Sequence, residues 1–141
     1  MAGSSWQELK DRIDLIEETY EFLLGYAAQG MSTEQAMRSD GQLRHFLKGA
    51  NEAVSRLADL FLAVIEEEGL ESGNDYSDFV DVLREDARKA GAAIRVTAIQ
   101  PGISSQLIDN LNASVHIRAL LTDVFLLDEL IAARSGAATT A

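Results

Sequence analysis

The sequence predicts an all-α protein, an antiparallel four-helix bundle with up-and-down topology. Apolar residues recur at spacings of three and four along four long segments, which is the period of one buried helix face. Glycine or proline ends the first three segments, and short connections between helices favour antiparallel neighbours. The length of 141 residues and the apolar fraction of 47% are typical of one globular domain.

The first long helix is expected to begin near Ser5, which forms a capping-box pattern with Glu8 three residues later. Gly30 is a typical helix end. A connector from Met31 to about Gly41 follows, and residues 32–34 are expected to open a short helical turn inside it. The apolar stripe of this first helix comprises Trp6, Leu9, Ile13, Ile16, Tyr20, Leu23 and Ala27.

The second long helix is predicted from about Gln42 to Glu68, with Gly69 as its end. The third starts near Asp75 and ends before Pro101, because proline lacks an amide hydrogen and excludes the helical conformation for its predecessor. The two stripes are Leu43, Leu47, Ala50, Val54, Leu57, Phe61 and Val64, and then Tyr76, Val80, Leu83, Ala87, Ala90, Ile94 and Thr97.

The fourth helix is predicted over roughly Ser104 to Arg134 and is apolar on more than one face. Such a helix is either central in its bundle or buries a surface against another chain, so a homodimer through this helix is left open. Residues 1–135 are therefore expected to form the single domain, and 136–141 a flexible tail. Its apolar residues are Leu107, Leu111, Val115, Ile117, Leu120, Leu121, Val124, Phe125, Leu127 and Ile131.

Composition excludes several classes of function. The chain has no cysteine, which excludes disulfides, thiolate metal sites and a cysteine nucleophile. The net charge of −11 argues against a nucleic acid or an anionic membrane as partner, and is compatible with a protein partner. No secretory signal and no apolar run of about 20 residues is visible, so we expect a cytoplasmic protein.

One histidine has a distinctive setting on the second long helix. In the heptad of that helix His45 falls at the position furthest from the apolar seam, and Lys48 and Gly49 are its neighbours at i+3 and i+4. An exposed imidazole is a nucleophile that can be neutral near physiological pH, and a lysine offers positive charge to phosphoryl oxygens. The glycine leaves room for another protein and costs about 1 kcal/mol of helix stability relative to alanine.

The run from His45 to Ala50, with the letters HFLKGA, resembles the H-x-L-K-G-S/A signature of histidine phosphotransfer (HPt) domains. The resemblance implies a four-helix bundle without kinase activity of its own, in which His45 accepts a phosphoryl group from an aspartate of a response-regulator receiver domain and returns it to another. It implies that Lys48 and Gly49 shape the site, and that the Mg²⁺ of the reaction belongs to the regulator. The family usually has a small residue before the histidine, where this chain has Arg44.

The alternative is a non-catalytic interaction protein, such as an adaptor, assembly chaperone or inhibitor, that binds a protein through acidic and apolar helix faces. His116 has no lysine–glycine pair after it and is interpreted as a flanking or interface residue. Neither histidine has a glutamate three residues before it, as di-iron bundles require, and residues 66–68 are interpreted as a solvated acidic surface. No metal and no other cofactor is therefore expected.

Overall fold

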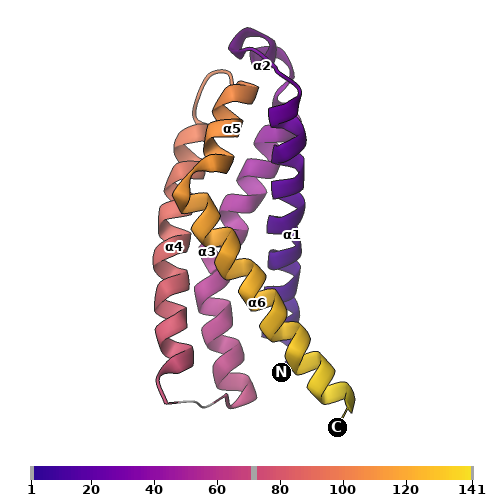
Figure 1. The fold of residues 1–141 in the computed structure, drawn as a ribbon, viewed down its shortest axis with the longest axis vertical. Helices are drawn as coiled ribbons and strands as arrows, with labels where there is room; N and C mark the ends of the chain where they lie inside the picture. The colour runs from indigo at the N-terminus through magenta and orange to yellow at the C-terminus, as the bar shows by residue number, and fades with distance from the viewer. Residues whose placement is uncertain (1, 71–72, 141) are drawn as a thin grey trace.

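The computed structural model describes residues 2–70 and 73–140, with side chains for 5–70 and 73–133. This part of the chain is all-helical, which confirms the predicted all-α class, and six helices rather than four follow one another along it (Figure 1). They are α1 (Ala2–Ala28), α2 (Thr33–Ser39), α3 (Gly41–Glu68), α4 (Asp75–Ala98), α5 (Ser105–Ala113) and α6 (Val115–Thr140). Among the described residues, no helix combines the length and apolar character needed to cross a membrane.

Helices α1, α3 and α4 correspond to the first three predicted long helices. Every residue of their three predicted stripes is buried or half-buried, so the helical period read from the sequence identifies the core faces. Helix α3 packs against both α1 and α4. Gly69 ends α3 in the left-handed conformation, with φ of 62°, as expected of a glycine at a helix end. The most deeply buried large side chains are Leu9, Ile13, Leu43, Leu47, Leu57, Leu83, Ile103, Ile108 and Leu127.

The capping box predicted at Ser5 and Glu8 is wrong. Helix α1 begins at Ala2, so Ser5 lies inside it and its hydroxyl donates to Glu67 at 2.7 Å. A capping box forms instead at the expected short helix α2. The Ser32 hydroxyl accepts from the Gln35 amide, and the Gln35 side chain accepts from the Ser32 amide.

The predicted fourth helix is two helices rather than one. Helix α5 ends at Ala113, Ser114 has extended backbone angles (φ −59°, ψ 134°), and α6 begins at Val115. The Ser114 hydroxyl accepts a hydrogen bond from the amide of His116 at 3.2 Å. The serine therefore acts as a helix cap for α6, and this local bond competes with continuation of α5.

The break lets the two halves of this segment pack on different partners. Helix α5 packs mainly against α1, whereas α6 packs mainly against α4 and also contacts α1. Figure 1 shows α6 running obliquely to the other long helices, from the α4 side toward the N-terminal end of α1. Helix α6 extends to Thr140, and the side chains of the predicted tail, 136–141, lie outside the described residues. The flexibility of that tail stays a prediction.

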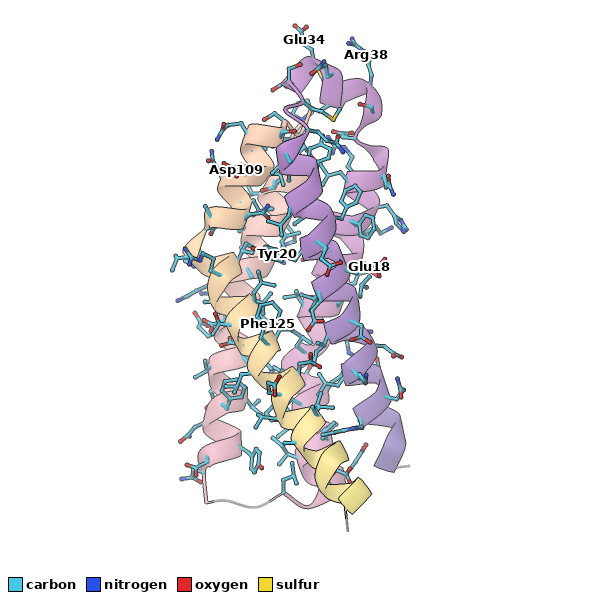
Figure 2. The ribbon with its side chains drawn as sticks, turned by 45° about the vertical axis from the view of Figure 1, so that its right-hand side comes forward. Glu18, Tyr20, Glu34, Arg38, Asp109 and Phe125 are labelled. Carbon is cyan, nitrogen blue, oxygen red and sulfur yellow. The ribbon has the colours of Figure 1, made fainter. Side chains whose placement is uncertain are left out.

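Helix α2 lies at one end of the molecule, beyond the ends of α1 and α3 (Figure 1). The side chains of Glu34 and Arg38 point away from the other helices there (Figure 2).

Next to α2, the segment between α4 and α5 is joined to α1 by hydrogen bonds. The Tyr26 hydroxyl donates to the Ile103 carbonyl at 2.6 Å, and the Ser105 hydroxyl donates to the Tyr26 carbonyl at 2.7 Å. These two bonds join the last turns of α1 to the start of α5 and the loop before it.

Candidate functional site

His45 lies on α3, one turn after the start of that helix, and its side chain is exposed. Lys48 is exposed one turn further along, and Gly49 is half-buried beside the contact with α1. The structure therefore brings the three predicted site residues together on adjacent positions of one helix. The exposure of His45 agrees with its place in the heptad, furthest from the seam.

The neighbouring aromatic residue holds this stretch of α3 against α1. The Phe46 ring stacks on Phe22 of α1, with ring centroids 4.4 Å apart and planes 21° from parallel. The His45 ring lies edge-on to Phe46, with centroids 6.3 Å apart. An offset aromatic stack of this kind stabilises a contact by about 1 kcal/mol beyond its buried area. The backbone that carries His45 is therefore fixed by packing, while the imidazole itself remains open to solvent.

Gly49 is not required by packing. A Cβ atom added to it would meet only Cδ2 of Leu15, at 3.8 Å, which is an ordinary van der Waals contact. Alanine would therefore fit here and would stabilise the helix by about 1 kcal/mol. A shallow hollow of about 310 Å³ lies next to this glycine, between α1 and α3, and its wall includes Glu8, Asp11 and Arg12. The glycine leaves the surface of α3 open one turn after the histidine, although the hollow itself is lined by neither His45 nor Lys48.

Arg44, which precedes the histidine, has a structural role. Its guanidinium donates to the Asp40 carboxylate through Nε at 2.9 Å and Nη2 at 3.0 Å. It also donates to the carbonyls of Ala98 at 2.7 Å and Gln100 at 2.6 Å, at the end of α4. One side chain thus joins the start of α3 to the last turn of α4, and so fixes the turn that presents His45.

Asp40 completes this connection. Its carboxylate is 7% exposed and accepts from the Ile103 amide at 3.2 Å as well as from Arg44. The hydrogen bond from Arg44 holds the pKa of Asp40 below its ordinary value, against the opposing effect of burial. The carboxylate therefore stays charged and paired at neutral pH. It is the last residue before α3, but it bonds to side-chain and loop partners rather than capping the helix.

Two further polar features were not identified from the sequence. Asp123 of α6 is 8% exposed and lies near the Asp86 carboxyl group of α4, and its buried Oδ2 atom has no hydrogen-bond partner among the described residues. Burial, together with the neighbouring Asp86 carboxyl group, raises the pKa of Asp123 to about 7. The second feature is a groove lined by arginines between α3 and α4. Helical periodicity carries no signal for either, because each forms between helices.

His116 lies exposed in the first turn of α6, on a different helix from His45. Its backbone amide donates a hydrogen bond to the Ser114 hydroxyl, which caps α6. Within residues 5–70 and 73–133, no three histidine or carboxylate side chains come together in an arrangement able to hold a metal ion.

Comparison with known proteins gives no matching family model, and no significant match among curated proteins or solved structures.

Proposed function

We propose that this protein is a histidine phosphotransfer protein, with His45 as the residue that carries the phosphoryl group. The observation that supports it best is the exposed imidazole of His45 with Lys48 one turn away and Gly49 opening the surface beside it. The partner is the receiver domain of a response regulator, and the proposal places the exchange in the cytoplasm.

In this proposal a neutral nitrogen of the His45 imidazole attacks the phosphorus of an aspartyl phosphate on the receiver domain. The new N–P bond forms as the P–O bond to the aspartate breaks, and the aspartate leaves as a carboxylate. The reverse reaction returns the phosphoryl group to a second aspartate. The ammonium group of Lys48 places positive charge near the phosphoryl oxygens, and Mg²⁺ bound to the receiver domain neutralises the rest.

The helix contacts are compatible with the antiparallel four-helix bundle that the resemblance implies. Helices α1, α3 and α4 would be three members of the bundle, and α5 and α6 together would occupy the fourth position. Support comes from the contacts of α5 with α1 and of α6 with α4, on either side of that position. Arg44 fits this arrangement as the residue that connects α3 to the end of α4.

Phosphoramidate, a small phosphoryl donor, tests the proposal directly. The purified chain is incubated with it and examined by intact mass spectrometry and ³¹P NMR. We expect an acid-labile adduct of one phosphoryl group, lost in His45→Gln and retained in His116→Gln, which removes the other exposed histidine. Lys48→Ala is expected to slow formation of the adduct. An adduct that persists in His45→Gln would show that the phosphoryl group lies elsewhere.

A second candidate is a non-catalytic interaction protein that binds a partner protein through α6. Phe125 and Leu126 are 48% and 49% exposed on this helix, and Leu130 is 37% exposed. Figure 2 labels Phe125 on α6. Adjacent exposed apolar side chains of this size are typical of protein contact surfaces. Sedimentation analysis over a range of concentrations tests whether that partner is a second copy of the chain. Self-association that Leu126→Glu abolishes would support this candidate.

A further inference from the structure

A groove of about 330 Å³ lies between α3 and α4, beyond the part of α3 that carries His45. Buried apolar side chains of Val54, Ala58 and Ala87 are among its lining residues. Polar groups from both helices complete the lining, among them Asn51 and Ser55 of α3. The groove thus has the composition typical of a small-molecule site, an apolar surface with a few polar groups around it.

Three arginines of α4 line this groove, at Arg84, Arg88 and Arg95. Their spacings of four and seven place them on one face of the helix. They are three of only 12 Lys and Arg residues in a chain with a net charge of −11. The lining also includes one carboxylate, Glu85, so it has two more positive than negative side chains. This local excess is opposite in sign to the charge of the chain as a whole, and an oppositely charged ligand would be attracted to it.

These guanidinium groups are held loosely by the protein itself. Arg84 pairs with Asp59 at 2.8 Å and Arg88 pairs with Glu85 at 2.7 Å, and all four side chains are more than half exposed. Exposed ion pairs of this kind contribute little to stability, so a ligand can replace them at low cost. Among the described residues, Arg95 bonds to a neutral partner, the Asn51 side-chain oxygen at 3.2 Å, and forms no ion pair.

Gly91 is what allows Arg95 to lie over the groove. A Cβ atom on Gly91 would come within 2.9 Å of Nη1 of Arg95 and 3.6 Å of the Asn51 oxygen. Any larger residue at this position would require the guanidinium to shift from its present place beside Asn51. A glycine in the middle of a helix is less favourable than alanine, and at Gly91 the missing side chain leaves space for the Arg95 guanidinium.

We propose that this groove binds a small organic anion, in which a phosphate or carboxylate group is held by the arginines of α4 and an apolar body lies on Val54, Ala58 and Ala87. Guanidinium groups match the geometry of both oxyanions and can bind them with two parallel hydrogen bonds. The volume is at the lower end of the range for ligand sites, which limits the occupant to a small molecule. The proposal does not depend on phosphotransfer at His45.

Titration with phenyl phosphate and with benzoate, followed by ¹H–¹⁵N NMR and calorimetry, tests this site. Benzyl alcohol serves as the uncharged control. We expect at least one of the two anions to shift the amides of residues 51–58 and 84–95 in a saturable way, and benzyl alcohol to leave them unchanged. Tighter binding of phenyl phosphate would identify the ligand as a phosphate ester, and tighter binding of benzoate would identify a carboxylate.

Matched variants locate the binding. Arg95→Gln is expected to weaken binding at least tenfold, and Gly91→Ala to weaken it by displacing Arg95. Arg118→Gln, at an exposed arginine of α6, makes the same change in net charge and is expected to leave affinity within twofold. Arg88→Gln gives a second test on a side chain that is 65% exposed, should Arg95→Gln fail to fold. The proposal is overturned if neither anion gives saturable shifts, or if Arg118→Gln weakens binding as much as the groove variants do.

Discussion

Arg44 shows how one side chain connects distant parts of the chain. Its guanidinium satisfies the buried Asp40 carboxylate and the carbonyls of Ala98 and Gln100 at once. Arg44→Ala would leave that carboxylate buried without its counterion and would leave the end of α4 without a donor. We expect a loss of about 2 kcal/mol in the free energy of unfolding, measured by urea denaturation. Arg44→Lys should recover part of this loss, because a single ammonium group cannot replace the planar fork.

The matched control for Arg44→Ala is Arg118→Ala, which removes an exposed arginine from α6. It should change stability by less than about 0.5 kcal/mol. Equal effects of the two substitutions would mean that Arg44 acts only through net charge.

Leu57 faces the core from α3 whereas His45 faces solvent, so the two should respond differently to truncation. Leu57 is completely buried, so Leu57→Ala is expected to cost about 2–5 kcal/mol through lost burial and the cavity left behind. His45 is exposed, and His45→Gln should change the free energy of unfolding by less than about 0.5 kcal/mol. Thermal and urea denaturation of both variants measures the two changes in the free energy of unfolding. A near-neutral Leu57→Ala would remove this leucine from the core.

Residue positions on the seams could be predicted from the sequence, whereas contacts made across the fold could not. Leu47 and Leu83 are buried as their helical period requires. Phe125, one of the apolar residues of the predicted fourth helix, is 48% exposed on α6, which runs obliquely to the other long helices. The role of Arg44 depends on carbonyls more than 50 residues away, and sequence spacing contains no information about them.

At the scale of the elements, the turn between α4 and α5 passes unusually close to α2. A Cβ atom on Gly102 would lie 2.4 Å from the Thr33 carbonyl oxygen and 2.7 Å from Cγ of Met37. Gly102→Ala must therefore displace backbone, and we expect a cost of about 1–3 kcal/mol. Gly25→Ala is the control, because nothing lies within 4 Å of its added Cβ and α1 is helical there. It should stabilise the protein by up to about 1 kcal/mol.

Thermal melts of these two variants measure the change in stability caused by a steric clash at Gly102 and by a gain in helix propensity at Gly25. A Gly102→Ala variant as stable as the parent would show that α2 moves aside freely.

Most helix ends are set by residues close to them in the sequence, whereas the break between α5 and α6 is not. Gly30 and Gly69 take positive φ at helix ends, as glycine allows, and α4 ends three residues before Pro101. The break at Ser114 was missed because a serine alone does not end a helix. Ser55 lies inside α3, where its hydroxyl donates back to the Glu52 carbonyl. The two serines differ in the packing around them, since α5 and α6 must reach different neighbours.

For the molecule as a whole, α6 places carboxyl groups close to carboxyl groups of two other helices. On the α4 side, Asp123 lies near Asp86. On the α1 side, Asp128 lies near Glu17, whose pKa is raised first by burial and then by the charges of Asp128 and Asp14. Two carboxyl groups close together repel each other unless one of them keeps its proton. The packing of α6 in this acidic chain is therefore sensitive to pH.

The direction of this dependence follows from the pKa of Asp123. That pKa is about 7 in the folded protein, against an ordinary value of 3.8, so the folded state binds more protons between these limits. The free energy of unfolding should therefore fall as pH rises from about 4 to about 7 and should level off above that, with a slope below about 1.4 kcal/mol per pH unit. Asp40 acts in the opposite sense. Its lowered pKa stabilises the fold above pH 3.8, and this contribution is lost as pH falls below that value.

Asp123→Asn isolates the contribution of α6. The amide has the shape of the protonated acid and stays uncharged beside Asp86 at every pH. The variant should match the parent protein near pH 4, exceed it in stability at pH 8, and show a smaller slope between the two. Urea denaturation across this pH range measures the difference, with Asp109→Asn, an exposed position on α5, as the control for net charge. If Asp109→Asn flattened the slope equally, the effect would come from general charge repulsion, whereas a change confined to Asp123→Asn would assign it to the contact that joins α6 to α4.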